Sequence, residues 1–155
     1  MNTLYKGLAV ALLHVLMVLS LGGKLLYDRH TRPRVWVKAA SYDPNLPIRG
    51  RYVALQVQVR MQGINRAWNQ NVVLSEEKGE LVGTTTEENT GVMVDAYGML
   101  SQPVLFFLPE HVKDPSWLQR GQELWVEVTV PRKGPPRPIQ LAVKDQTGWH
   151  PLNLR

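Results

Sequence analysis

The sequence of 155 residues contains no cysteine. Disulfide bonds, thiolate metal sites and cysteine nucleophiles are therefore excluded together. Histidine is also scarce, and no two histidines form an H-x-x-x-H pair; the four are His14, His30, His111 and His150. Because metal sites need ligands at such short spacings, we expect no metal site and no cofactor.

The chain contains no long run of charges of one sign. Lys and Arg number 18 against 13 Asp and Glu, which gives a formal charge of +5. The basic residues are spread over turns and match no RNA-binding or zinc-finger spacing, so nucleic acid is not the expected partner. Basic residues that flank a membrane segment are more simply explained by anionic lipid headgroups.

One long hydrophobic run lies near the N-terminus. No residue from Gly7 to Gly23 is formally charged, and the segment to Tyr27, where Lys24 can snorkel, reaches the ~20 residues that span a bilayer. Residues 1–28 are therefore predicted to form a membrane anchor helix. A cleavable signal peptide with small residues at Ser20 to Gly22 is the alternative, but the apolar run continues beyond that point. We expect His14 to be neutral and bonded to a neighbouring helix.

The orientation of this anchor is contested by two rules. Basic residues after the helix outnumber Lys6 and the amino terminus, which by the positive-inside rule favours a cytoplasmic domain. Long domains, however, translocate largely regardless of flanking charge, and the short N-terminus resembles a signal anchor. We predict a single-pass protein of the bacterial inner membrane with its domain outside the cytoplasm.

Residues 29–155 predict a single, mostly β, antiparallel domain with one short helix. The stretch "RYVALQVQVRM" alternates as a single strand with one buried face would. One face carries the apolar residues Val53, Leu55, Val57, Val59 and Met61. The other face carries Tyr52, Ala54, Gln56, Gln58 and Arg60. Further strands are expected in "RVWVKAA", on both sides of the Lys78-Gly79 turn, and in "PVLFFLP", "ELWVEVTVP" and "RPIQLAV", the last one. The short helix is predicted within 109–121.

The stretch "PIRGRYVALQV" combines a constrained basic corner with the best strand. Pro47 favours an extended conformation before it, and Gly50 permits a positive φ or a close backbone approach. Arg49 and Arg51 flank that glycine. The corner is either a turn with two solvated arginines or a docking site for a headgroup or an acidic partner, held beside the membrane.

Nearly the whole chain resembles the GDYXXLXY proteins, small bacterial membrane-associated proteins of unknown molecular function. The likeness rests on "SYDPNLPIRGRYVALQV" after a hydrophobic helix and on "FFLPEHV" later. Gly50, Tyr52 and Leu55 match the name-giving motif, whereas Arg51 replaces its aspartate and Val57 its final tyrosine. The resemblance implies an integral membrane protein as partner and adds Leu55 to the candidate corner.

A fainter likeness connects "SYDPNLPIRG" with the serine box of type I signal peptidases. It would make Ser41 a nucleophile that needs a neutral lysine as its base. Lys78 lies among acidic residues in "SEEKGE", which keep it protonated. We therefore predict a non-enzymatic accessory protein of another membrane protein, with a Ser/Lys hydrolase as the alternative.

Four tryptophans are candidates for interfacial or partner contacts: Trp68, Trp117, Trp125 and Trp149. Trp125 lies within a predicted strand, so it is expected in the core instead.

Overall fold

The computed structural model describes residues 3–42, 52–63, 69–112, 114–115 and 117–153. The chain divides into two compact units, Met1–Arg32 and Pro33–Arg155. The first is a helix and the second is the β domain, so the division lies slightly beyond the predicted boundary after residue 28.

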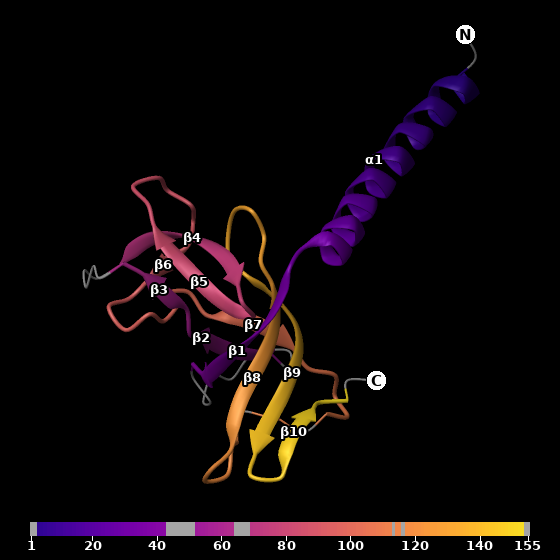
Figure 1. The fold of residues 1–155 in the computed structure, drawn as a ribbon. Coiled ribbons are helices and arrows are strands. Elements are labelled where there is room, and N and C mark those ends of the chain that lie inside the picture. The colour runs from indigo at the N-terminus through magenta and orange to yellow at the C-terminus, as the bar shows by residue number, and fades with distance from the viewer. Residues whose placement is uncertain (1–2, 43–51, 64–68, 113, 116, 154–155) are drawn as a thin grey trace. The chain divides into compact units, whose positions relative to one another are not determined.

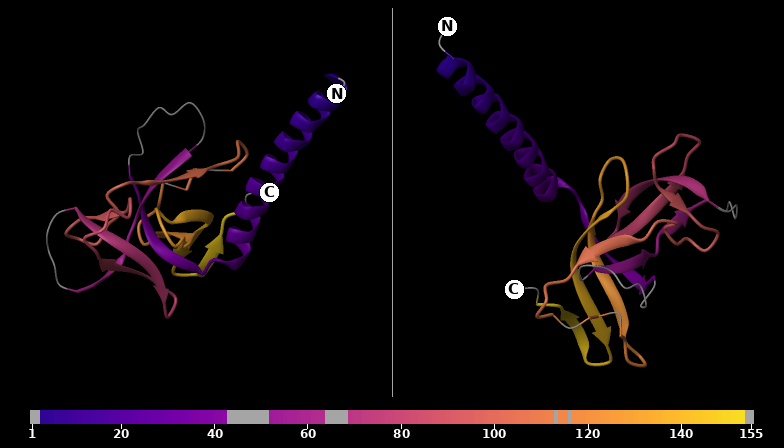
Figure 2. Two further views of the ribbon diagram at one scale, coloured as in Figure 1. Left: turned by 90° about the horizontal axis from the view of Figure 1, so that it is seen from above. Right: turned by 180° about the vertical axis from the view of Figure 1, so that it is seen from behind.

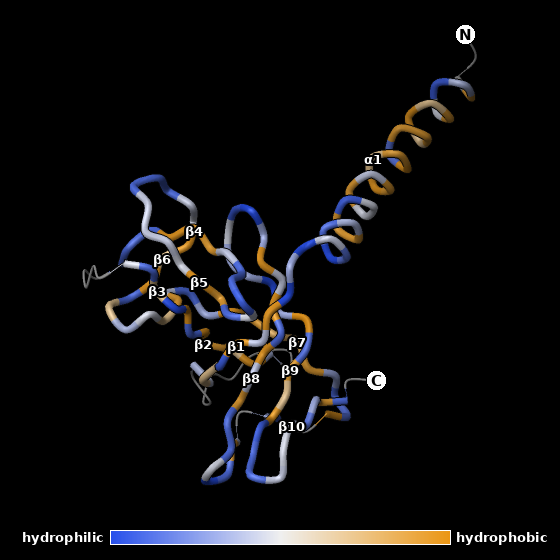
Figure 3. Tube along the Cα trace, viewed as in Figure 1, coloured by the Kyte–Doolittle hydropathy of each residue, from blue (hydrophilic) through white to orange (hydrophobic). Residues whose placement is uncertain are grey.

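Among the described residues of the first unit, helix α1 (Thr3–Thr31) is the only helix or strand. Figure 3 shows its apolar middle in orange, and its described side chains are almost all exposed. Its length and composition suffice to cross a membrane, as an anchor or as a signal sequence. His14 Nδ1 lies 2.8 Å from the Val10 carbonyl oxygen within the same helix.

Six strands form the larger sheet of the β domain, in the order β10-β9-β8-β1-β2-β7 (Figure 1). All neighbours in this sheet are antiparallel. Their bounds are β1 (Arg34–Ser41), β2 (Tyr52–Val57), β7 (Val104–Phe107), β8 (Glu123–Thr129), β9 (Arg137–Asp145) and β10 (Gly148–Pro151). A register shift between Glu127 and Val128 accommodates Pro138, which has no N–H to donate to the ladder.

Four strands form the second sheet, in the order β3-β5-β4-β6. They are β3 (Arg60–Gln62), β4 (Gln70–Glu77), β5 (Glu80–Thr85) and β6 (Met93–Val94). The β4–β5 hairpin closes at the predicted turn, where Lys78 and Gly79 both have positive φ (53° and 80°), as a two-residue hairpin turn requires. The two views of Figure 2 show this sheet on one side of the six-stranded sheet.

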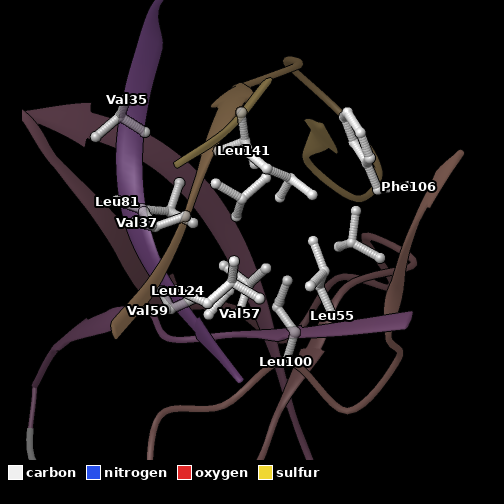
Figure 4. Packing of buried hydrophobic residues seen from close by; sticks show 14 of the residues in the cluster. Val35, Val37, Leu55, Val57, Val59, Leu81, Leu100, Phe106, Leu124 and Leu141 are labelled. Carbon is white, nitrogen blue, oxygen red and sulfur yellow. The ribbon is translucent and has the colours of Figure 1, made fainter. Parts of the chain in front are cut away.

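Both sheets contribute to one hydrophobic core. Figure 4 shows side chains of β1, β2, β5, β7, β8 and β9 that converge there, and Leu55, Val57, Val126 and Leu141 are fully buried. Every residue of this cluster belongs to the second unit. The β domain therefore has a hydrophobic core of its own.

The structure corrects the prediction in four places. "RYVALQVQVRM" is two strands, because the chain leaves the larger sheet after Val57 and enters the smaller one as β3, which pairs with β5 in parallel. The described residues between 109 and 121 form turns instead of a helix. Strands β6 and β10 were not predicted, so "RPIQLAV" does not contain the last strand.

Candidate interaction surfaces

The predicted docking corner is only partly described. Arg49, Gly50 and Arg51 lie outside the described residues. Tyr52 is the first residue of β2 and is 43% exposed, whereas Leu55 is fully buried. Leu55 pairs with Ser41 on one side and Val104 on the other, so it packs in the core and does not belong to an exposed corner.

An apolar surface surrounds Tyr52 on the outer face of β2 and β7. Tyr52 pairs with Phe107 across the strands, and the two rings meet edge to face with centroids 5.4 Å apart. Leu105 and Phe107 are 57% and 59% exposed. We call Tyr52, Leu105 and Phe107 the β2–β7 surface.

The sequence contained a signal for this surface that the strand prediction did not use. In "VLFF", Val104 and Phe106 face the core while Leu105 and Phe107 face outward. A strand with apolar residues at both the inward-facing and the outward-facing positions has two apolar faces. Strand β7 also has β2 as its only strand neighbour within the described residues, and such apolar edges are templates for pairing with another chain.

The register places the β2–β7 surface far from the start of the domain. Ser41 at the end of β1 pairs with Leu55, and the Tyr42 N–H donates to the Ala54 carbonyl at 2.9 Å. Tyr52 therefore lies beyond the Ser41 end of β1. Arg34 begins that strand at the opposite end, about 23 Å away at ~3.3 Å per residue. The Tyr52 end of β2 therefore lies at the opposite end of β1 from Arg34.

A tryptophan cluster covers part of the outer face of the larger sheet. The ring of Trp149 on β10 meets Trp36 edge-on at 5.1 Å and Trp125 at 5.4 Å between centroids. The Lys144 ammonium lies 5.7 Å from the Trp125 ring. Trp125 is half-buried and points away from the core, so its predicted core position is wrong.

One ion pair flanks this tryptophan cluster. Lys38 Nζ lies 2.6 Å from Glu123 Oε1, and the Trp125 indole N–H donates to the same carboxylate at 3.2 Å. These donors, Lys38 first, lower the pKa of Glu123. The tryptophan cluster buries aromatic faces against one another, so its role is packing. Of the other two candidate tryptophans, Trp117 is 75% exposed and Trp68 lies outside the described residues.

A shallow cavity of about 450 Å³ lies beside the β9–β10 turn, lined among others by Trp117, Leu118, Asp145 and His150. Asp145 accepts hydrogen bonds from the Thr147 hydroxyl (2.5 Å) and the Thr147 N–H (2.8 Å), and His150 Nε2 lies 3.2 Å away. The Thr147 hydroxyl and then its amide hold the pKa of Asp145 at about 2, below the usual 3.8.

These three side chains do not form a hydrolytic triad. The Thr147 hydroxyl donates to Asp145, and His150 Nε2 approaches both Thr147 Oγ1 (2.8 Å) and the carboxylate. A triad needs one imidazole nitrogen on the nucleophile and the other on the acid. The arrangement instead closes the turn between β9 and β10.

Ser41, the nucleophile of the hydrolase alternative, is half-buried at the end of β1. Among the described residues no hydrogen bond joins it to a lysine, and Lys78 lies exposed in the β4–β5 turn. Within the same residues, no group of three or more His, Asp or Glu could hold a metal ion.

Comparison with protein-family models, curated proteins and solved structures gives no match for this chain. The resemblance to the GDYXXLXY proteins stays a prediction.

Proposed function

We propose that this chain is a membrane-anchored, non-enzymatic interaction protein whose β2–β7 surface docks onto another integral membrane protein. One observation carries the proposal. Two large apolar side chains, Leu105 and Phe107, are more than half exposed on an edge strand, next to the partly exposed Tyr52. Contiguous exposed apolar groups of this kind mark interaction sites more often than isolated ones do.

The composition of the surface matches the centre of a protein interface. Aromatic residues and arginine are enriched where binding energy concentrates. Tyr52 and Phe107 already contact each other, so part of their side-chain entropy is lost before a partner binds. Arg49 and Arg51 adjoin Tyr52 in the sequence, which favours a partner with acidic residues around an apolar patch.

The register favours protein over lipid as the occupant of this surface. Tyr52 and Arg34 lie at opposite ends of β1, and Arg34 follows the helix after only two residues. A surface about 23 Å along the strand from Arg34, the first residue of β1, suits an extramembrane part of the partner. Following the family resemblance, we place the protein in the bacterial inner membrane with its β domain outside the cytoplasm.

The test compares two double variants on exposed strand faces. Leu105→Ser with Phe107→Ser alters the β2–β7 surface, and Val73→Ser with Met93→Ser alters the outer face of the smaller sheet, where both side chains are also exposed. We expect the first pair to weaken binding of the membrane partner about 30-fold, as the loss of an apolar hot spot of about 2 kcal/mol would, and to reduce its recovery on co-purification accordingly. The second pair should leave recovery unchanged.

Melting curves of both double variants exclude unfolding as the cause. Equal recovery with both variants, or equal loss, would contradict the proposal. The hydrolase alternative has its own test, because a serine-reactive probe that labels Ser41, and fails to label Ser41→Ala, would make the protein an enzyme.

A further inference from the structure

A basic loop projects from the end of the β domain that joins the helix. The loop connects β8 to β9 with the sequence Pro131–Arg132–Lys133–Gly134–Pro135–Pro136, and Arg137 then begins β9. Arg132, Lys133 and Arg137 are exposed, and the segment contains no acidic residue. Figure 3 shows the loop in blue, in line with its polar composition.

Hydrogen bonds tie the base of this loop to the start of the domain. The Val130 N–H donates to the Pro33 carbonyl at 3.0 Å, and Arg34 pairs with Thr129, which in turn pairs with Arg137. Neighbouring strands are ~4.8 Å apart, so Arg34 and Arg137 are separated by about 10 Å. The loop and the first residue of β1 therefore share one end of the sheet, as Figure 1 shows.

The loop is stiff and holds its cations outward. Three prolines restrict its backbone, Pro136 is buried, and Gly134 takes the positive φ of 87° that closes it. The Thr129 hydroxyl donates to the Arg137 carbonyl at 3.5 Å across its base. Little backbone entropy remains to be lost when a ligand binds to such a loop.

The short link to α1 limits the distance between this end of the β domain and the end of the helix. Helix α1 has 29 residues and is about 43 Å long, which matches the ~40–45 Å of a bilayer with its headgroup layers. Only Arg32 and Pro33 separate its last residue, Thr31, from β1. Three chain steps span at most ~11 Å, so Arg34 cannot move far from the membrane surface.

We propose that Arg132, Lys133 and Arg137 form a binding site for the phosphate groups of anionic lipids, which holds this end of the β domain against the bilayer. The proposal rests on the membrane anchor of the proposed function but not on the β2–β7 surface. It assigns lipid and protein partners to opposite ends of β1. Each Lys or Arg near an anionic surface contributes about 1 kcal/mol, and the attraction decays within a Debye length of ~8 Å.

The absence of cysteine makes a direct test possible with the full chain. Pro135→Cys places one fluorophore on the loop, and Gln146→Cys places one on the β9–β10 turn, about 26 Å away along β9. The labelled proteins are inserted into nanodiscs that contain a lipid with a quencher on its headgroup. The bulk lipid is either phosphatidylcholine alone or a mixture with phosphatidylglycerol.

We expect the loop label to be quenched strongly in the anionic nanodiscs, less in the neutral ones, and less again at high salt. Arg132→Ser with Lys133→Ser should lower the equilibrium constant for headgroup contact about 30-fold, since two cations are lost. Arg120→Ser with Lys144→Ser removes the same charge at the far end of the β8–β9 hairpin and should change nothing. The Gln146 label should stay bright throughout.

Three outcomes would overturn the site: equal quenching in both lipids, equal effects of the two double variants, or equal quenching of both labels. Competition by soluble inorganic phosphate as effective as anionic lipid would show a free-phosphate site instead. The nanodiscs contain no protein partner, so the proposed docking function can fail without affecting this result. Exposed surface substitutions usually change stability by less than ~0.5 kcal/mol, and melting curves verify that every variant folds.

Discussion

At the scale of single residues, position on a strand decides between surface and core. Tyr52 and Leu55 belong to the same motif, yet the first is partly exposed and the second is fully buried. Residues three apart on a strand point to opposite faces. A motif of this spacing therefore cannot place both side chains in one docking corner, and its tyrosine is the member available to a partner.

Asp145 makes the acid stability of the β9–β10 turn predictable. Its pKa is about 2 in the folded chain against 3.8 normally, because the Thr147 hydroxyl and amide donate to it. A group whose folded pKa is depressed stabilises the fold above its unfolded pKa, and this contribution disappears as the pH falls through the folded value. The melting temperature should therefore fall between about pH 4 and pH 2, in part through this carboxyl.

Asp145→Asn should make the melting temperature less sensitive to pH in this window, as measured by calorimetry. Thr147→Val removes the first donor and should raise the pKa of Asp145 in an NMR titration. The assignment would be incorrect if the melting temperature of Asp145→Asn fell with pH as steeply as that of the unaltered chain. It would also be incorrect if Thr147→Val left the pKa of Asp145 unchanged.

At the scale of elements, the chain passes from the larger sheet to the smaller one between β2 and β3. A loop elsewhere in the sequence, and not the alternation of the strand itself, fixes this crossing. After Val57 the alternation continues, but the partners change from β1 and β7 to β5. The Val59 N–H donates to the Gly98 carbonyl at 2.7 Å, and the Leu100 N–H donates to Val57 at 3.0 Å. The segment around Gly98 thus holds the crossing point.

Gly98 should tolerate no side chain. Its φ is +79°, and a Cβ would lie 2.7 Å from the Val59 carbonyl oxygen, which is backbone and cannot swing away. Gly91 has a similar φ of +72° with open space around it. A substitution at Gly91 therefore measures the cost of a positive φ for a residue with a side chain, without any steric clash. We expect Gly91→Ala to cost about 1–2 kcal/mol in free energy of unfolding and Gly98→Ala at least ~1 kcal/mol more.

Urea denaturation measures both variants on the same scale. If Gly98→Ala were no less stable than Gly91→Ala, the contact at Val59 would not be the point that fixes the crossing.

At the scale of the whole molecule, the helix and the β domain are joined through a very short link. Only Arg32 and Pro33 lie between α1 and β1, and the core belongs entirely to the second unit. The β domain therefore has the core it needs to fold by itself. The orientation of the chain in the membrane decides in which compartment the β domain lies. It therefore also decides which partner and which lipid leaflet the two proposed surfaces can meet.

We predict that the β domain lies outside the cytoplasm. Alkaline phosphatase fused after Arg155 should then be active, and a fluorescent protein that folds only in the cytoplasm should be dark at the same position. The opposite pattern would support the cytoplasmic orientation that the positive-inside rule favours. The basic β8–β9 loop lies at the same end of the sheet as Arg34, so its cations would then join the basic residues that follow the helix. The mass of the mature chain distinguishes a retained anchor from a cleaved signal sequence.

Sequence alone determined the features that are local. The apolar run from Gly7, the alternation in β1, β2 and β8, and the Lys78-Gly79 turn each depend on residues close together in the chain. Such features are fixed by side-chain periodicity and backbone preference, which need no knowledge of distant partners. The β domain after a single apolar helix was predictable for that reason.

Tertiary structure decided everything that depends on pairing between distant segments. Periodicity gives the faces of a strand but not its neighbours, so it could not reveal that "RYVALQVQVRM" divides between two sheets or that β3 runs parallel to β5. It also could not bring Phe107 to Tyr52, or tie Val130 to Pro33. Both proposed surfaces arise from register between strands far apart in the sequence, and only the assembled sheet fixes that register.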